Sequence, residues 1–272
     1  MSPRNPSRIA AVIGYPVSHS RSPAIHNAAF EITGLDWFYT YFEVPAGSGA
    51  AALDAMRTLN LGGLSVTMPL KPEAAAAADM MDDEVAALGV ANCIVPVAGK
   101  KLRAANTDSY GFVAGLKADA GITPAGRSVL ILGGGGAARA IAWGVASAGA
   151  ESVIVANRTP TAAEETAALA GSVGRVGSHK DVRSADIVVN ATSVGMGSDG
   201  SVPCDPDLLQ TGQVAVDIVY EPLETAWLCA LRSRNVEAHG GLSMLVYQAA
   251  RAFTLWTDKP APVEAMRKAA LG

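Results

Sequence analysis

The chain is poor in charge and in cysteine. Only 17% of its 272 residues are charged, and a formal net charge of −4 provides no basic field to attract nucleic acid or an acidic membrane. The three cysteines (Cys93, Cys204 and Cys229) lie far apart and form no metal-ligand spacing with the four histidines. So few cysteines, in an odd number, are typical of the reducing cytoplasm, and we expect neither a disulfide framework nor a bound metal.

Long hydrophobic runs are missing as well. The apolar stretch at residues 9–13 is too short for a signal sequence and is followed by Gly14 and Pro16. No uncharged apolar stretch approaches the roughly 18–20 residues of a bilayer-spanning helix. We therefore expect a cytoplasmic protein with no membrane partner. Half of the residues are hydrophobic, which is enough for a sizeable core in one or two domains.

Short apolar runs alternate with stretches of helical periodicity along the whole chain. This alternation is typical of βαβ units and predicts an α/β fold with parallel sheets. We expect strands at residues 8–13, 37–44, 61–67, 92–97, 128–132, 152–156, 186–190 and 213–218. We expect helices at residues 23–34, 48–59, 72–80, 109–119, 136–149, 160–170, 222–233 and 241–256. Residues 195–207 are rich in Gly, Pro, Ser and Asp and are expected to form a loop.

Residues 128–159, SVLILGGGGAARAIAWGVASAGAESVIVANRT, have the pattern of one βαβ unit. They place Gly133-x-Gly135-x-x-Ala138 directly after a Val/Leu/Ile strand and directly before an alanine-rich helix. Glycines at such a turn allow a pyrophosphate to approach the helix N-terminus, and a small third residue lets the helix pack on the strand. The pattern predicts a doubly wound, Rossmann-type nucleotide-binding domain. Because it begins so late in the chain, a separate domain is expected before it.

The end of the second strand of this unit indicates which cofactor binds. An acidic residue there favours NAD by accepting hydrogen bonds from the ribose 2′-hydroxyl, and this chain has none. Arg158 offers instead a guanidinium group that matches phosphate geometry, which predicts NADP. NADP-dependent relatives often carry a second basic residue four positions later. Here that residue is Ala162, so mixed use of NAD and NADP stays open.

The run GYPVSHSRSPAIHNAAF at residues 14–30 places hydroxyl groups between a short apolar strand and a helix. Free amides at a helix entrance and the helix dipole both favour an anion there. Ser18, Ser20 and Ser22 alternate, so an extended chain would point them the same way. A second interpretation is that Ser22 only caps the helix before Pro23. We assign His26, one helical turn later, to orientation of the serine loop or to packing.

Two further residues stand at expected helix starts. Lys71 follows the strand-and-turn sequence GLSVTMPL and precedes Pro72. The positive end of a helix dipole disfavours a charged ammonium group but suits a lysine that exchanges a proton. Asp108, in the run Asn106-Thr107-Asp108, precedes a helix and is also a favoured N-cap residue. Each of the two could therefore be a solvated or capping residue instead.

Taken in chain order, these motifs resemble the shikimate dehydrogenase family over nearly the whole length. The resemblance rests on the serine run, VTMPLK, NTD, the glycine turn, ANRT and the C-terminal GGLSMLVYQ. It implies two α/β domains, the first of which is completed by the C-terminal helices. We expect a substrate-binding domain at residues 1–107 with residues 239–272, and an NADP-binding domain at residues 108–238.

The resemblance also implies roles for individual residues. In the family, two serines hold the substrate carboxylate, and a lysine and an aspartate pair beside the hydroxyl that is oxidised. By position, the two serines are Ser20 and Ser22, and the pair is Lys71 and Asp108. Further implied substrate contacts are Thr67, Asn92, Asn106, Tyr220 and Gln248. The implied cofactor contacts are Gly133, Gly134, Gly135, Gly136, Ala137, Asn157, Arg158, Thr159, Thr192, Ser193 and Gly241.

The activity implied by the resemblance is the reversible reduction of 3-dehydroshikimate to shikimate with NADPH and without a metal, a step in aromatic amino-acid biosynthesis. Lys71 is the implied proton donor to the C3 oxygen, and Asp108 hydrogen-bonds the same hydroxyl. Three positions depart from the family pattern. Ser65 stands where Asn is usual, and Ser109 and Ser243 replace glycines.

Several alternatives stay open at this point. One is a quinate or aminoshikimate dehydrogenase with relaxed use of NAD and NADP. Another is a ligand sensor without turnover, although a sensor needs neither Lys71 nor Asp108. A third is a reductase of the glutamyl-tRNA type, which leaves the serine run unexplained. The expected partner is a small-molecule substrate, and we expect a monomer or a homodimer.

Overall fold

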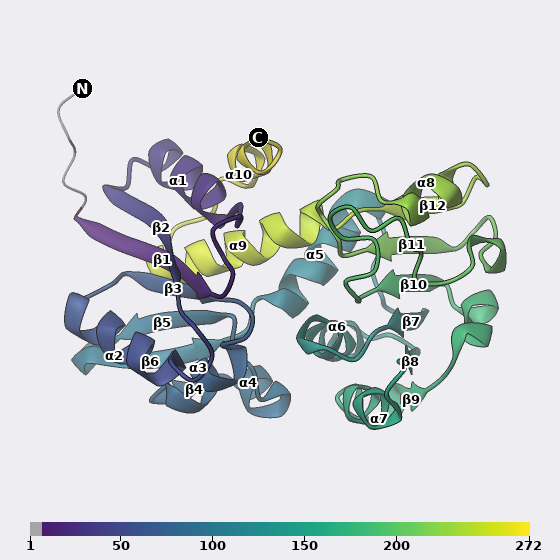
Figure 1. Cartoon of the computed structure of the whole chain (residues 1–272), viewed down its shortest axis with the longest axis horizontal. Coiled ribbons are helices and arrows are strands. Elements are labelled where there is room, and N and C mark those ends of the chain that lie inside the picture. Colours follow the sequence, from purple (N-terminus) through teal and green to yellow (C-terminus); the bar gives the residue numbers. More distant parts are fainter. Residues whose placement is uncertain (1–6) are drawn as a thin grey trace. The chain divides into compact units, whose positions relative to one another are not determined.

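The computed structural model describes residues 7–272, which divide into two compact units. The first consists of the chain up to Thr107 and of Gln248–Gly272, and the second is Asp108–Tyr247. Each unit is a sheet with packed helices, and Figure 1 labels their elements. The predicted α/β fold with parallel sheets is confirmed. None of the helices within residues 7–272 is long and apolar enough to cross a membrane.

The sheet of the first unit has the strand order β2-β1-β3-β5-β6-β4. Its strands are β1 (Arg8–Gly14), β2 (Trp37–Glu43), β3 (Gly63–Val66), β4 (Met80–Met81), β5 (Cys93–Val97) and β6 (Lys101–Ala105). The first three are parallel, whereas β5 runs antiparallel to both β3 and β6. As a result, the ends of β1, β3 and β6 and the start of β5 share one edge of the sheet.

Helices cover both faces of this sheet. They are α1 (Ser22–Ile32), α2 (Gly49–Leu59), α3 (Lys71–Ala77), α4 (Asp83–Leu88), α10 (Val263–Ala270) and the later part of α9 (Leu242–Thr257). Ala11 and Ile13 of β1 form a buried core with Leu53 and Met56 of α2. Burial of such a cluster is the main stabilising term for a unit of this size. Helix α10 packs against α1, so the last helix of the chain lies beside the first (Figure 1).

The sheet of the second unit is parallel throughout, with the order β12-β11-β10-β7-β8-β9. This is the strand order of the doubly wound dinucleotide-binding fold. The strands are β7 (Ser128–Leu132), β8 (Ser152–Ala156), β9 (Gly174–Val176), β10 (Ile187–Asn190), β11 (Val214–Asp217) and β12 (Glu237–His239). The helices are α5 (Asp108–Ala120), α6 (Gly136–Ser147), α7 (Pro160–Ala168) and α8 (Ala226–Arg232). Alternate residues of β7 enter two separate cores, one on each face.

The first unit resumes inside α9, at Gln248, rather than at residue 239. Strand β12 pairs with β11, so His239 belongs to the second sheet. The first turns of α9 pack against α5, where Ser243 Oγ donates to Asp119 at 2.7 Å. A Cβ added at Gly115 of α5 would lie 3.1 Å from the Met244 nitrogen, which indicates close backbone packing.

Every strand and helix expected from the sequence is present, with ends shifted by a few residues. The expected loop is confirmed from Gly195 to Asp205, after which a short 3-10 helix spans Pro206–Leu208. Six elements were missed: β4, β6, β9, β12, α4 and α10. Strands β4, β9 and β12 have two or three residues and helix α4 has six, too few for a periodic pattern. Strand β6 and helix α10, with five and eight residues, are as long as elements that the sequence did predict.

A stack of buried rings joins α1, β2 and α9 in the first unit. The imidazole of His26 lies 4.4 Å from the Tyr39 ring, nearly parallel to it, and 5.0 Å from the Trp256 ring. Trp256 Nε1 donates to the Ile94 carbonyl at 3.1 Å. Neither ring nitrogen of His26 has a hydrogen-bond partner among the described residues. His26 is therefore a packing residue, one of the two roles expected for it.

The buried imidazole makes stability depend on pH. Burial lowers the pKa of His26 from its usual 6.5 to about 3, so between these values the unfolded chain binds a proton that the folded chain does not. We expect the free energy of unfolding to fall below about pH 6.5, by up to ~1.4 kcal/mol per pH unit from this residue. Urea titrations near neutral pH and about two units lower measure the effect. The variant His26→Phe should lose this part of the pH dependence, whereas the control His179→Phe, at an exposed histidine, should keep it. If the free energy of unfolding depended on pH equally in both variants, His26 would not be its source.

Candidate active site

The serine run connects β1 to α1, and its geometry differs from one sequence-based expectation. Helix α1 begins at Ser22 itself, so the interpretation of Ser22 as the N-cap is wrong. Arg21 precedes the helix at the N-cap position without a side-chain cap, and its guanidinium donates to the Ala270 carbonyl at 2.6 Å. Ser20 Oγ accepts a hydrogen bond from the Ser22 amide at 3.2 Å. The two serines predicted to bind an anion are therefore joined at the entrance of α1.

Three predicted substrate residues lie at the sheet edge shared by β3, β5 and β6. Thr67 follows β3, Asn92 precedes β5 and Asn106 follows β6. Strand pairing puts them side by side, because Cys93 pairs with both Ser65 and Ala105. The Val66 amide donates to the Asn92 carbonyl at 2.7 Å, and the Thr67 amide donates to the Ile13 carbonyl at 2.9 Å. The second bond ties this edge to the end of β1.

The side-chain amide of Asn92 forms hydrogen bonds within the protein. Asn92 Nδ2 donates to Thr107 Oγ1 at 3.0 Å, and Asn92 Oδ1 accepts from the Thr107 amide at 2.7 Å. Asn92 is 4% exposed and Thr107 is fully buried. These two bonds hold the turn that carries Asn106 and Asp108, so Asn92 positions the turn whether or not it also contacts a substrate.

Lys71 and Asp108 are each the first residue of a helix, one position earlier than the helix starts expected from the sequence. Lys71 is the first residue of α3, and its carbonyl accepts from the Ala91 amide at 3.0 Å, next to Asn92. Asp108 is the first residue of α5 and is 7% exposed. Lys71 therefore belongs to the first unit and Asp108 to the second, which starts at that residue.

The predicted site residues fall in both units. The first unit contains Ser20, Ser22, Thr67, Lys71, Asn92, Asn106 and Gln248. The second contains Asp108, Tyr220 and all of the predicted cofactor residues. Gln248 lies in α9, two helical turns before the buried Trp256, so that part of the helix is anchored to the first unit.

The glycine turn of the second unit has two parts with different surroundings. Gly133 has a φ of +127°, and a Cβ added there would lie 2.7 Å from the Ala191 carbonyl. A Cβ added at Gly134 would meet Asn157 and Ala162 at 3.0–3.1 Å. Around Gly135 and Gly136, in contrast, a Cβ would meet nothing within 4 Å. Packing and backbone conformation require glycine at Gly133 and leave little room at Gly134, whereas the last two glycines leave an open cradle at the start of α6.

This cradle fits a dinucleotide phosphate. Helix α6 has twelve residues and begins at Gly136, so its first amides have no intrahelical partner and face the cradle with the positive end of the helix dipole. The Gly133 amide donates to the Ala156 carbonyl at 2.9 Å and fixes the turn beside the end of β8. Arg158 follows directly and is exposed, with its guanidinium available to a phosphate. Asn157 Nδ2 donates to the Thr159 carbonyl at 3.2 Å and shapes this loop.

A buried network that sequence reasoning missed shapes the neighbouring loop. Asn190 Oδ1 accepts from the Thr192 amide and hydroxyl at 3.1 and 2.6 Å, while its Nδ2 donates to Asp217 at 2.9 Å. The Asp217 carboxylate also accepts from Thr225 Oγ1 at 2.8 Å. Burial raises the pKa of Asp217 above its usual range, against these donors. The aspartate follows an apolar strand, VAVD, a context that gives no sign of such a partner set.

Gly241 is required by the packing of α9 on the end of β11. Its amide donates to the Val219 carbonyl at 3.0 Å, and its own carbonyl accepts from Leu245 in the first turn of α9. A Cβ added at Gly241 would collide with the Ile218 carbonyl. The backbone can approach so closely only with glycine at this position.

Comparisons with known proteins agree with this arrangement. A family model described as shikimate dehydrogenase substrate binding domain matches residues 12–94, and one described as shikimate 5′-dehydrogenase C-terminal domain matches residues 241–271. A third, described as NADP oxidoreductase coenzyme F420-dependent, matches residues 128–218. The shikimate dehydrogenase (NADP(+)) of Moorella thermoacetica is 43% identical over 269 residues, which cover 95% of this chain and 90% of that protein. This chain belongs to the shikimate dehydrogenase family.

Solved structures of the family have the same fold. A shikimate 5-dehydrogenase from Thermus thermophilus, in complex with NADP(H) and shikimate, superposes with a TM-score of 0.91 at 37% identity over 97% of this chain and 98% of that one. A quinate dehydrogenase from Corynebacterium glutamicum, in complex with NAD, superposes with a TM-score of 0.90 at 29% identity over 97% and 99% of the two chains. The family is thus confirmed, and its fold accommodates more than one substrate and cofactor.

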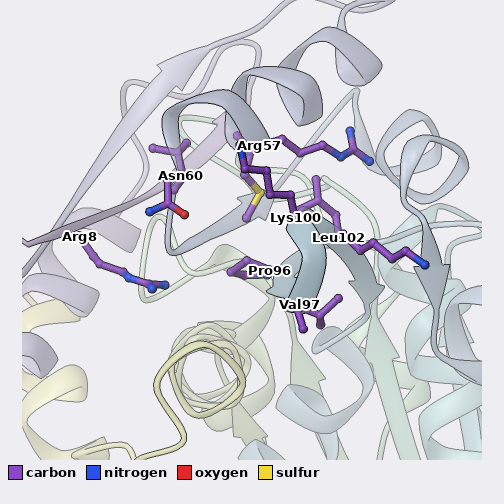
Figure 2. Close-up of a pocket in the computed structure, with 11 residues that line it drawn as sticks. Arg8, Arg57, Asn60, Pro96, Val97, Lys100 and Leu102 are labelled. Atoms are coloured by element: carbon purple, nitrogen blue, oxygen red, sulfur yellow. The ribbon is translucent and has the colours of Figure 1, made fainter.

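The first unit also has a hollow of about 270 Å³, shown in Figure 2, which lies away from the predicted site residues. Arg8, at the start of β1, and Lys100, before β6, place it at the sheet edge opposite Thr67 and Asn106. Arg57 also lines it, but its guanidinium already binds Asp54 and Asp79, each at 2.8 Å. None of the predicted site residues lines this hollow.

Proposed function

We propose that this chain is an NADP-dependent shikimate dehydrogenase that reversibly reduces 3-dehydroshikimate to shikimate. The observation that carries the proposal is the sheet edge of the first unit. There the serine pair stands at a helix entrance, while Thr67, Asn106 and Lys71 follow neighbouring strands or turns. Hydroxyls, amides and one lysine are the groups that a polyhydroxylated carboxylate requires.

In the proposed reaction, bound NADPH supplies the hydride, and the protein supplies orientation and the proton. Lys71 Nζ donates a proton to the C3 oxygen during reduction and accepts it back during oxidation. Asp108 hydrogen-bonds the same hydroxyl and holds the lysine. Ser20 and Ser22 donate to the carboxylate. Other substrate contacts proposed by position are those of Thr67, Asn92, Asn106, Tyr220 and Gln248.

The cofactor assignment follows the second unit. The open cradle at Gly135 and Gly136, together with Ala137 in α6, takes the pyrophosphate, and Arg158 with Thr159 takes the 2′-phosphate. Thr192, Ser193 and Gly241 contact the nicotinamide half. By function, we divide the chain into a substrate-binding domain at residues 1–107 with the C-terminal helices, and an NADP-binding domain between them.

The test is cofactor absorbance during the oxidation of shikimate and of quinate, each with NADP and with NAD. Fast turnover of shikimate with NADP is the expected result. The second candidate function is a quinate dehydrogenase, which is motivated by Ser65 and by the similar quinate dehydrogenase structure. A kcat/KM for quinate with NAD above that for shikimate with NADP would favour it. Shikimate binding without turnover of any pair would overturn the enzyme assignment in favour of a sensor.

The role of Arg158 predicts a selective loss of NADP affinity. We expect Arg158→Ala to raise the KM for NADP by about 10- to 100-fold, since a charge-assisted bond to phosphate is worth about 1.5–3 kcal/mol. The KM for NAD should change little because NAD has no 2′-phosphate. Steady-state kinetics with both cofactors measure the ratio, and Arg183→Ala, at another exposed arginine of the second unit, is the control. Equal losses for NADP and NAD would contradict the assignment.

A further inference from the structure

A buried tyrosine hydroxyl reaches the serine end of the proposed substrate site. Tyr39 of β2 is fully buried, and its hydroxyl lies 2.7 Å from Ser65 Oγ on β3. The strand register explains the contact: Tyr39 pairs with Ala10 and Ser65 with Val12, two residues further along β1. Both side chains therefore point to the same face of the sheet. The Ser22 side chain is a further polar neighbour of the same phenol.

Neighbouring residues fix both the ring and the backbone of Tyr39. His26 stacks on it, and Trp256 lies 6.0 Å away. The Asn27 side chain binds both backbone groups of Tyr39, accepting from its amide at 2.8 Å and donating to its carbonyl at 2.9 Å. These contacts hold the hydroxyl at Ser65 Oγ.

Physical chemistry decides which hydroxyl donates. Burial raises the pKa of Tyr39 far above its usual range, so the phenol keeps its hydrogen. A phenol is a stronger acid than an aliphatic alcohol and hence the better donor, so Tyr39 donates to Ser65 Oγ. Ser65 must then direct its own hydrogen elsewhere. Without the phenol, the Ser65 hydroxyl could rotate and present a lone pair to an anion.

We propose that Tyr39 is a positioning residue for the carboxylate end of the substrate. By donating to Ser65, it turns the Ser65 hydroxyl into a third donor beside Ser20 and Ser22. This role rests on the proposed binding of the carboxylate by the two serines. It also explains how Ser65, which is shorter than the Asn usual at this position, provides a polar contact there: the phenol orients it.

Steady-state kinetics of shikimate oxidation by NADP test the proposal with Tyr39→Phe, Ser65→Ala and the double variant. We expect each single substitution to raise the KM for shikimate about tenfold, the effect of one hydrogen bond to a charged group. The kcat should stay within about twofold, and the KM for NADP should not change, because the affected donors bind the substrate alone. The double variant should be no worse than Ser65→Ala, because both substitutions remove the same bond.

Two further measurements distinguish a positioning role of Tyr39 from a purely structural one. Tyr41→Phe, at a half-exposed tyrosine two residues along β2, is the matched control and should leave the KM for shikimate unchanged. The substitution Tyr39→Phe should weaken the binding of shikimate much more than the binding of shikimate methyl ester, which lacks the charge. Equal losses for ester and acid, or additive effects in the double variant, would overturn the proposal.

Ser22→Ala distinguishes this failure from failure of the site itself. An unchanged KM for shikimate in Ser22→Ala would overturn the carboxylate site and, with it, the role of Tyr39. A raised KM in Ser22→Ala together with an unchanged KM in both Tyr39→Phe and Ser65→Ala would overturn the role of Tyr39 alone.

Discussion

Replacing Lys71 with Met should lower kcat for shikimate oxidation by about 10³-fold, within the range of roughly 10²–10⁴ typical for loss of a general acid–base group. The physical reason is that the C3 oxygen then loses the lysine with which it exchanges its proton, while the hydride donor and the substrate contacts remain. Cofactor binding should be nearly unchanged, because Lys71 lies in the first unit and the glycine turn in the second. Absorbance kinetics and NADPH titration measure the two effects separately.

Two companion variants sharpen this prediction. Lys71→Arg keeps the positive charge but cannot release a proton near neutral pH, so its kcat should be almost as low as that of Lys71→Met. Lys180→Met, at an exposed lysine in the second unit, should behave as the wild type. Activity close to wild type in Lys71→Arg would mean that Lys71 acts as a fixed charge and not as an acid or base.

Replacing Asn92 with Ala should lower both stability and kcat. The substitution leaves the buried amide of Thr107 without its acceptor, a loss of about 1–3 kcal/mol in the free energy of unfolding. It also releases the turn between Asn106 and Asp108, and a small displacement of a catalytic group can cost about 10²-fold in rate. Urea unfolding and kcat for shikimate oxidation measure the two consequences.

A second variant tests the same hydrogen bonds from the other partner. Thr107→Val removes the hydroxyl that accepts from Asn92 Nδ2 but keeps the amide that donates to Asn92 Oδ1. We expect a smaller loss of kcat than in Asn92→Ala, in the same direction. If Asn92→Ala raised only the KM for shikimate and left stability and kcat intact, a direct substrate contact would be the main role of Asn92.

The nucleotide-binding half was the more predictable part. The glycine turn, the strand before it and the helix after it are consecutive in the chain, so local patterns identify them. The strands at residues 128–132 and 152–156 have the expected bounds. Local patterns did not reveal that the first two glycines serve packing and the last two leave the open cradle. Gly133 and Gly134 pack against Ala191 and Asn157, which come later in the chain.

The substrate half depended more on tertiary structure. The family resemblance implied Thr67, Asn92 and Asn106 only one position at a time. Their common edge follows from the antiparallel pairing of β5 with β3 and β6, and β6 was not expected at all. Tyr39 was missed because WFYTYFE reads as a core strand, in which a hydroxyl attracts no attention until its partner is known.

The sequence by itself determined the α/β fold, the order of most elements and the family, since these depend on periodicity and on motifs whose residues are adjacent in the chain. Only the tertiary structure decided that Ser22 is inside α1, that Asn92 holds Thr107, and that Tyr39 donates to Ser65. The last two contacts join residues that strand register and helix packing bring together across 15 and 26 positions. The register depends on burial of whole faces of the sheet, which no local pattern contains.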